Sequence, residues 1–408
     1  MQSSKLRNYF KKEVPSLLTF NFEHLTYYLI LLFLPTQFGR HFWPKFSFVN
    51  GARIDYLSPT LYFTDVLIIL LFIFSVFPVI PNSLASLRSG FRDLNLVKML
   101  KPFGLAPEST LGAQGGRVWH DKKKIGSWIA IMALLTIGIT FAKSPLAGLY
   151  GLVKLLEFIF FGFYTAKIVK NIYSEKKENS LLLPFVAGIL FESVLAIWQY
   201  LQQGSIGGLL YFLGERSFNS QTPGIANASI NGSLILRPYG TFPHPNVLAG
   251  YLIIAMVIIS SNFKYQNSKF QKVLILICTV IGTAALFLTM SRVAIALWLL
   301  IISYRAMLII YKRIKDAKLL ILYSSFVILS VGIIFISPLR FRFLNFNFSD
   351  ESIVVRKDLT TISLEMIKNN PVIGLGINNF LVNLPAYEKI KENAFFVSFQ
   401  PVHNIFLL

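Results

Sequence analysis

Long apolar runs dominate the chain and alternate with shorter polar segments. The runs are apolar on all sides, so periodicity identifies no face, and their length decides the assignment. About 20 apolar residues suffice to cross a bilayer as a helix. We therefore expect an all-helical polytopic membrane protein with about ten spans, the tenth beginning at His403. The other expected spans are 25–38, 60–80, 126–142, 146–166, 181–201, 246–262, 273–290, 293–311 and 319–337.

One amphipathic pattern lies outside these runs, in the long polar segment 338–402. Residues 356–369 place apolar side chains at rough helical spacing, namely Leu359, Ile362, Leu364 and Ile367. This spacing predicts a helix that lies in the loop before the last span. The first span is interrupted by Pro35, which a helix interior does not favour.

Composition supports the membrane assignment, because 54% of the residues are hydrophobic and only 14% are charged. A soluble protein has about 25% charged residues. The single cysteine, Cys278, lies inside an apolar run, which excludes a disulfide within the chain and a cysteine-based metal site. The basic N-terminal segment has no small-residue cleavage site, so we expect no signal peptide.

The net charge of +20 is explained by topology. Of the 39 basic residues, 24 lie in alternate segments, which are 1–24, 81–125, 167–180, 263–272 and 305–318. Positive loops stay in the cytoplasm, so the N-terminus is expected inside. Contact with anionic membrane lipids is a secondary role of these charges, and we expect no nucleic-acid partner.

The opposite segments therefore face outward, and two of them, 202–245 and 338–402, are long. Segment 39–59 is aromatic and basic, which is typical of an interfacial belt, although an entrance for a lipid substrate is an alternative. Inside the spans, Lys154 and Glu157 are spaced to pair on one helix face. Glu192 is also within a span, and these groups brace the bundle or line a path for ions.

The outward segment LRPYGTFPHPN carries Arg237 and His244. Its prolines and Gly240 favour a rigid, bent backbone. Pro245 and Asn246 are expected to open a helix, whose N-terminus favours anions. His244 is expected to brace this turn.

Two further outward groups complete a candidate site. Ser291 and Arg292 occupy a very tight turn between two spans, where an arginine is costly without a partner and is read as functional. His403 begins the last span and can accept a proton near neutral pH. Two arginines suit a phosphate or pyrophosphate, and one histidine suits proton abstraction from an alcohol. The acidic pairs Asp350–Glu351 and Glu388/Glu392 have no metal-site spacing, so we expect neither a metal nor a cofactor.

The order of short motifs carries a resemblance. Arg-x-x-Gly-Thr-Phe-x-His-Pro-Asn precedes one span and Ser-Arg follows a later one, while Asn-Pro-x-x-Gly-x-Gly-x-Asn-Asn-Phe (370–380) and His-Asn lie near the end. This pattern resembles the O-antigen ligase and O-antigen polymerase superfamily over roughly residues 180–408. The resemblance divides the chain into N-terminal helices (1–180) and a catalytic core (181–408). Family members usually continue beyond this point, so we expect the core to be truncated.

The resemblance implies a GT-C-like, metal-independent glycosyltransferase of polysaccharide biosynthesis in the cytoplasmic membrane. Its donor would be a glycan on undecaprenyl pyrophosphate, and its acceptor a glycan, a lipid or a protein. Arg237 and Arg292 match the arginines that contact phosphate, with Ser291 and Asn404 beside the substrate. His403 matches the proposed general base. A small-solute transporter is the alternative, although transporters place ionisable groups nearer the bilayer midplane.

Overall fold

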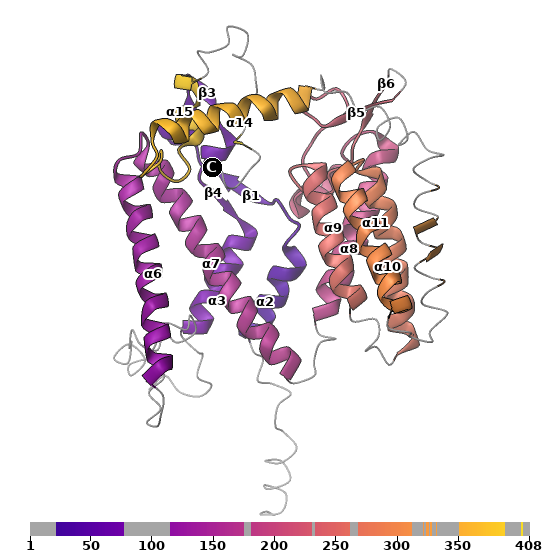
Figure 1. Ribbon diagram of the computed structural model, residues 1–408. Coiled ribbons are helices and arrows are strands. Elements are labelled where there is room, and N and C mark those ends of the chain that lie inside the picture. Colours follow the sequence, from indigo (N-terminus) through magenta and orange to yellow (C-terminus); the bar gives the residue numbers. More distant parts are fainter. Residues whose placement is uncertain are drawn as a thin grey trace, which may run out of the picture.

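The computed structural model describes residues 22–76, 115–174, 181–230, 233–261, 268–311, 351–387 and 401–402, with a few single positions between 321 and 332. Two groups of roughly parallel helices stand side by side, and one helix lies across one end of the group that contains the N-terminal helices (Figure 1). That end also carries all the described strands. It is termed the outer end, after the predicted topology.

The N-terminal group contains α2 (Phe22–Phe33), α3 (Phe63–Val76), α6 (Gly115–Thr140) and α7 (Pro145–Ser174). Helix α2 ends two residues before Pro35, as expected for a residue that disfavours helix on its N-terminal side. Aromatic side chains join these helices, because Tyr27 of α2 lies against Phe161 and Tyr164 of α7. Helix α2 also packs against the second group, through α8.

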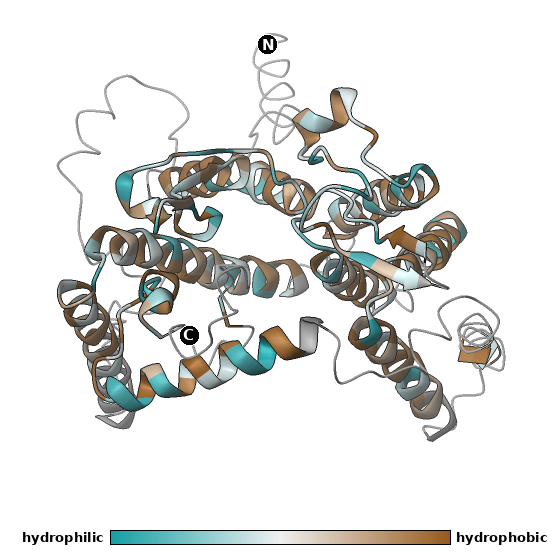
Figure 2. Ribbon diagram, turned by 90° about the horizontal axis from the view of Figure 1, so that it is seen from above, coloured by the Kyte–Doolittle hydropathy of each residue, from teal (hydrophilic) through white to brown (hydrophobic). Residues whose placement is uncertain are grey.

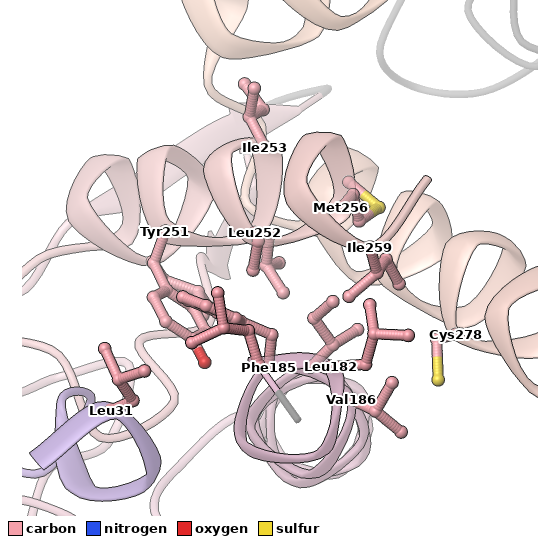
Figure 3. Close-up of a cluster of buried hydrophobic side chains, with 14 of the residues drawn as sticks. Leu31, Leu182, Phe185, Val186, Tyr251, Leu252, Ile253, Met256, Ile259 and Cys278 are labelled. Atoms are coloured by element: carbon pink, nitrogen blue, oxygen red, sulfur yellow. The ribbon is translucent and has the colours of Figure 1, made fainter. Parts of the chain in front are cut away.

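The second group contains α8 (Leu182–Gln202), α9 (Pro245–Ser261), α10 (Lys269–Leu288) and α11 (Arg292–Tyr311). Its core lies between α8, α9 and α10, where Leu252, Met256 and Ile259 are fully buried. Figure 3 shows Leu252 and Tyr251 of α9 pointing towards α8, with Leu31 of α2 beside the tyrosine. A Cβ on Gly282 would lie 2.8 Å from the sulfur of Met256, so the glycine allows α10 to approach α9 closely.

Eight of the nine spans expected before His403 coincide with helices. Several boundaries were wrong: α2 ends at Phe33, residues 60–62 form a strand before α3, α6 already begins at Gly115, and α7 continues to Ser174. Span 319–337, apart from single positions, and the span starting at His403 lie outside the described residues. By length and composition, three described helices are able to cross a membrane, at Pro145–Ile172, Leu182–Gln202 and Lys269–Leu288. The count of ten spans therefore stays a prediction.

Short antiparallel strand pairs cover the outer end. They are β1 (Gly39–His41) with β4 (Thr60–Tyr62), β2 (Phe48–Val49) with β3 (Ala52–Arg53), and β5 (Asn227–Ile230) with β6 (Ser233–Leu236). The 3-10 helices are η1 (Lys45–Ser47), η2 (Asp55–Leu57) and η5 (Gly208–Leu213). The aromatic segment 39–59 is thus a compact structure, in which Arg53 lies over the ring of Trp43 at 4.4 Å.

The helix that lies across the outer end is α14 (Glu351–Asn369), which confirms the predicted helix, and α15 (Phe380–Tyr387) follows it. In the view from above, hydrophilic and hydrophobic residues alternate along α14 (Figure 2). The predicted apolar stripe was partly wrong. Leu359 is buried as expected, but Leu364 and Ile367 are exposed, and the inward face continues through Ser363 and Met366.

A second core, termed the outer cluster, joins these helices to the strands and to α7. Its buried members are Val49, Ile54, Leu57, Ala147, Leu359, Met366, Phe380, Leu381, Leu384 and Val402. The described part of the long loop before the predicted last span, 351–387 with 401–402, is therefore a packed layer over the N-terminal group.

Candidate active site

Arg237 joins three parts of the outer end. It follows β6, and its side chain is only 6% exposed. Its Nε donates a 2.7 Å hydrogen bond to the carbonyl oxygen of Thr289, and its Nη2 donates one of 2.6 Å to Oδ1 of Asn246. The guanidinium thus ties β6 to the first turn of α9 and to the turn between α10 and α11. The sequence placed Arg237 in an outward segment and did not predict this burial.

The turn between α10 and α11 is as tight as predicted. Helix α10 ends at Leu288 and α11 begins at Arg292. Met290 has a positive φ of 52°, a conformation that few residues other than glycine adopt. Ser291 is buried, and its carbonyl oxygen accepts the first hydrogen bond of α11 from Ile295. Arg292 is half-buried at the start of α11, three residues after the Thr289 carbonyl that Arg237 binds. The structure therefore brings Arg237, Ser291 and Arg292 to one corner.

Gln199 of α8 fixes the backbone that follows Arg237. Its Oε1 accepts hydrogen bonds from the N–H groups of Tyr239 and Gly240, at 3.0 and 2.8 Å. Its Nε2 donates to the carbonyl oxygen of Gly240 and to Oε1 of Glu215. The buried carboxylate of Glu215 in turn accepts from the N–H groups of Ile206 and Gly207. The side-chain amide of Gln199 and the carboxylate of Glu215 thus provide hydrogen-bond partners for the backbone at residues 206–207 and 239–240.

Glu192 holds the same loop deeper in the bundle. It is fully buried, and its Oε2 accepts from the N–H of Thr241 at 3.0 Å. The hydroxyl of Thr241 lies 2.7 Å both from Oε1 of Glu192 and from the carbonyl oxygen of Pro35. Glu192 and Gln199 are seven residues apart, about 10 Å along a helix. The loop therefore descends beside α8 instead of staying at its end.

Gly240 permits this descent. Its φ is +59°, and a Cβ there would lie 2.2 Å from Oε2 of Glu192. Only glycine meets both conditions without rearrangement. The bent backbone expected from the sequence is thus confirmed. Glu192 has the bracing role that was one of the two expected of it, whereas Gln199 was not singled out.

His244 braces the start of α9, as predicted. Its Nδ1 accepts a 3.1 Å hydrogen bond from the N–H of Asn246, and its carbonyl oxygen accepts from the N–H of Val247 and of Leu248. Helix α9 begins at Pro245, where the missing N–H costs nothing. Asn246 is then oriented towards Arg237 from the first turn.

The pKa of Tyr239 depends on its burial and on nearby arginine charges. Its hydroxyl accepts a hydrogen bond from the N–H of Ala226 at 2.7 Å. Burial raises the pKa of Tyr239, while this hydrogen bond and the charges of Arg216 and Arg237 lower it in part. Arg216 is exposed and was not singled out in the sequence. Arg216 therefore adds a further positive charge near Tyr239.

His403 and Asn404 lie outside the described residues, so their predicted meeting with the arginines stays a prediction. The residue before them, Val402, is buried in the outer cluster with Leu359 of α14 and Leu384 of α15. The chain is thus anchored in that cluster immediately before His403.

The other charges inside the spans have a bracing role. Lys154 pairs with Glu157 at 3.0 Å, as their spacing predicted, and also with Asp65 of α3, which was not anticipated. Asp65 in turn accepts a 2.8 Å hydrogen bond from the N–H of Tyr62. This group joins α3 to α7.

Comparison with known proteins addresses the C-terminal third. A family model described as O-antigen ligase matches residues 277–408. This part of the chain belongs to the O-antigen ligase family. The match indicates an enzyme of that family, and the family implies a membrane glycan ligase or polymerase with lipid-linked glycans as substrates. Neither a search of curated proteins nor a search of solved structures found a match.

The O-antigen ligase match contains α11, α14 and α15, and most of α10. Ser291, Arg292 and His403 fall inside it, whereas Arg237 and the polar face of α8 precede it. The hydrogen bond from Arg237 to Thr289 crosses this boundary and connects the earlier residues to the O-antigen ligase segment.

Proposed function

We propose that the protein transfers or polymerises a glycan carried on undecaprenyl pyrophosphate, at the outer face of the cytoplasmic membrane. The observation that supports this proposal is the hydrogen bond between Arg237 and Thr289, because it ties the segment of Arg237 to the turn that precedes Arg292. The O-antigen ligase family supports the substrate class. The basic loops at the other end support an N-terminus in the cytoplasm.

In this proposal, Arg237 and Arg292 stabilise the pyrophosphate. A guanidinium stays charged and matches phosphate oxygens with a planar set of N–H donors. Arg237 also orders the turn that presents Arg292, through its hydrogen bond to Thr289. Charge that develops on the leaving oxygen is best stabilised by donors that are already in place, since no reorganisation is then needed. Ser291 and Asn404 flank these groups in sequence and are proposed to contact the substrate.

His403 is proposed as the general base. The hydroxyl oxygen of the acceptor forms a bond to the anomeric carbon, while the bond from that carbon to the pyrophosphate oxygen breaks. The hydroxyl proton passes to His403, and the electron pair of the broken bond leaves with the pyrophosphate. A positioned base contributes about 10²- to 10⁴-fold. Attack opposite the leaving group inverts the anomeric carbon.

The acceptor determines whether the enzyme is a ligase, a polymerase or a protein O-glycosyltransferase. These three share the donor chemistry proposed above and differ only in the molecule that supplies the hydroxyl. Glycan profiles of a strain that lacks the protein distinguish them. Loss of chain length indicates a polymerase, and loss of attachment indicates a ligase.

The decisive test is transfer by the purified protein in lipid nanodiscs with an undecaprenyl-pyrophosphate glycan. We expect His403→Ala to lose transfer and to retain donor binding, and Arg292→Ala to lose both. Arg292→Lys should recover only part of the activity, because an ammonium lacks the planar fork. Full transfer by His403→Ala, or full donor binding by Arg292→Ala, would remove the corresponding role. Gly224→Ala serves as a folded control, since nothing lies within 4 Å of the added carbon.

A further inference from the structure

The segment Asn-Pro-x-x-Gly-x-Gly-x-Asn-Asn-Phe (370–380) has no part in the chemistry above, yet it makes close contacts with the N-terminal group. Asn379 is fully buried beside the turn between α6 and α7. Its Oδ1 accepts from the N–H of Ser144 at 2.8 Å, and its Nδ2 donates to the carbonyl oxygen of Ser144 at 3.1 Å. One side-chain amide thus pairs with both backbone groups of a residue 235 positions earlier.

Two neighbouring hydrogen bonds reinforce this contact. Nδ2 of Asn378 donates to the carbonyl oxygen of Ala147 at 3.1 Å, from a backbone with a φ of +56°. From the other side, Nζ of Lys143 donates to the carbonyl oxygen of Val382 at 3.2 Å. The hydrogen bonds all involve backbone groups, so they specify a position along the chain and not merely a hydrophobic face.

Glycines on both surfaces let the backbones meet. Gly376 has a φ of +86°, and a Cβ there would lie 2.6 Å from the carbonyl oxygen of Gly138 in α6. On the opposing helix, a Cβ on Gly151 of α7 would lie 2.9 Å from Cβ of Asn378. Contacts this short are not seen between real side chains and backbone, so substitution at either glycine must separate the two surfaces.

The contact continues directly into the outer cluster. Helix α15 begins at Phe380, and the carbonyl oxygen of Asn379 accepts from the N–H of Asn383 in its first turn. Leu384 of α15 packs in the outer cluster with Leu359 of α14 and with Val402. The position of Asn379 therefore sets the position of α15, and through the cluster that of α14 and Val402.

We propose that Asn379, with Gly376 and Asn378, is a latch that positions the outer layer on the α6–α7 hairpin for the reaction. The proposal rests on the proposed function, in which the base follows Val402. Hydrophobic packing alone is non-directional, whereas the paired amide fixes one register. The latch governs the catalytic rate and leaves donor affinity to the arginines, so Asn379 is a positioning residue and touches no substrate.

Matched glycine pairs test this proposal. Gly376→Ala should break the latch, whereas Gly374→Ala introduces the same kind of left-handed strain, at a φ of +70°, with nothing within 4 Å of the new carbon. Within α7, Gly151→Ala should break the latch from the other side, and Gly162→Ala meets nothing within 4 Å. Asn379→Ala removes both hydrogen bonds, and Asn379→Asp removes the donor to Ser144.

Two readouts are measured in nanodiscs, namely kcat and KM for the donor, and the rate at which protease cleaves segment 351–387. In Gly376→Ala, Gly151→Ala and Asn379→Ala, we expect kcat to fall roughly 100-fold, as for a small misplacement of catalytic groups, with KM nearly unchanged. Cleavage should accelerate in the same variants. Gly374→Ala and Gly162→Ala should match the parent in kcat and should not cleave faster.

The outcomes separate the two proposals. Parental kcat in Gly376→Ala and Asn379→Ala overturns the latch and leaves the proposed function intact. A rise in KM without a fall in kcat also overturns it, since the segment would then act on donor binding. If the parent shows no transfer, the proposed function fails, and the reaction role of the latch fails with it. The protease assay still tests whether segment 376–379 is held on the α6–α7 hairpin. Equal cleavage rates in Gly376→Ala and Gly374→Ala would contradict that contact.

Discussion

The Nε of Arg237 lies 2.7 Å from the carbonyl oxygen of Thr289, so one buried side chain orders the turn that presents Arg292. The two arginines are therefore not independent. A substitution at Arg237 alters the backbone beneath Arg292, and its effect on activity includes a structural part. Arg292, which begins its helix at the edge of the same corner, gives the cleaner measure of the phosphate role.

Arg237→Ala should lower stability as well as activity. It leaves the buried Thr289 carbonyl without the Arg237 donor, which costs roughly 1–3 kcal/mol, whereas Asn246 is exposed to solvent. Thermal unfolding in detergent, followed by size-exclusion chromatography, measures this loss. Arg216→Ala is the control, because Arg216 also acts on Tyr239 through its charge but is exposed. Equal unfolding temperatures for the two variants would show that the Arg237 hydrogen bonds contribute little.

Glu192→Gln should leave stability almost unchanged, while Glu192→Ala should lower it. The hydroxyl of Thr241 carries one hydrogen but lies 2.7 Å from two oxygens, at Pro35 and at Glu192. A glutamine amide donates to that hydroxyl, accepts from the N–H of Thr241, and frees the hydroxyl hydrogen for Pro35. Alanine leaves the buried N–H of Thr241 without its acceptor, which costs roughly 1–3 kcal/mol. If glutamine proved as disruptive as alanine in thermal unfolding, Glu192 must act as a pure acceptor.

Gly240→Ala should be far more damaging than Gly224→Ala. Both glycines have positive φ, at +59° and +78°, so each alanine incurs about 1–2 kcal/mol of left-handed strain. Only at Gly240 does the new carbon also meet the carboxylate of Glu192, at 2.2 Å. The yield of folded protein and its transfer rate should fall in Gly240→Ala alone. Similar losses in both variants would assign the effect to strain and not to contact.

Cysteine labelling tests the topology. Ser217 and Ser174 are exposed at opposite ends of the bundle, and the native Cys278 is buried. A membrane-impermeant maleimide should label Ser217→Cys in intact cells and Ser174→Cys only after lysis. The reverse pattern would place the basic loops outside and contradict the positive-inside assignment.

The helices could be predicted from the sequence because each apolar run is long, but which face turns inward could not. On α14, Leu364 and Ile367 point outward, while Ser363 lies inside. The Ser363 hydroxyl donates to the carbonyl oxygen of Leu359 at 2.7 Å, which satisfies it within its own helix and allows its burial. A prediction from apolar spacing considers only apolar side chains. It therefore overlooks a serine that can be buried because its hydroxyl forms a hydrogen bond within its own helix.

The arginines of the site could be found because a cation inside an apolar sequence is conspicuous. The groups that hold the loop after Arg237 could be found only in part. Glu192 stood out within its span, but its partner lies 49 positions away, and Gln199, whose partners lie about 40 positions away, was not singled out. A polar residue within a span indicates that a partner exists, but only the fold says which segment supplies it.

The contacts of residues 35 and 36 limit how this protein can be divided. The carbonyl oxygen of Pro35 meets the Thr241 hydroxyl, and Oγ1 of Thr36 donates to the carbonyl oxygen of Leu213 at 2.7 Å. The segment recognised by the family model begins at residue 277, yet the loop that carries Arg237 is completed by the end of α2. A chimera that takes its first residues, up to residue 36, from a relative should therefore also take from that relative the segments around Leu213 and Thr241. The segment that the family model matches is therefore shorter than the part of the chain that must fold together.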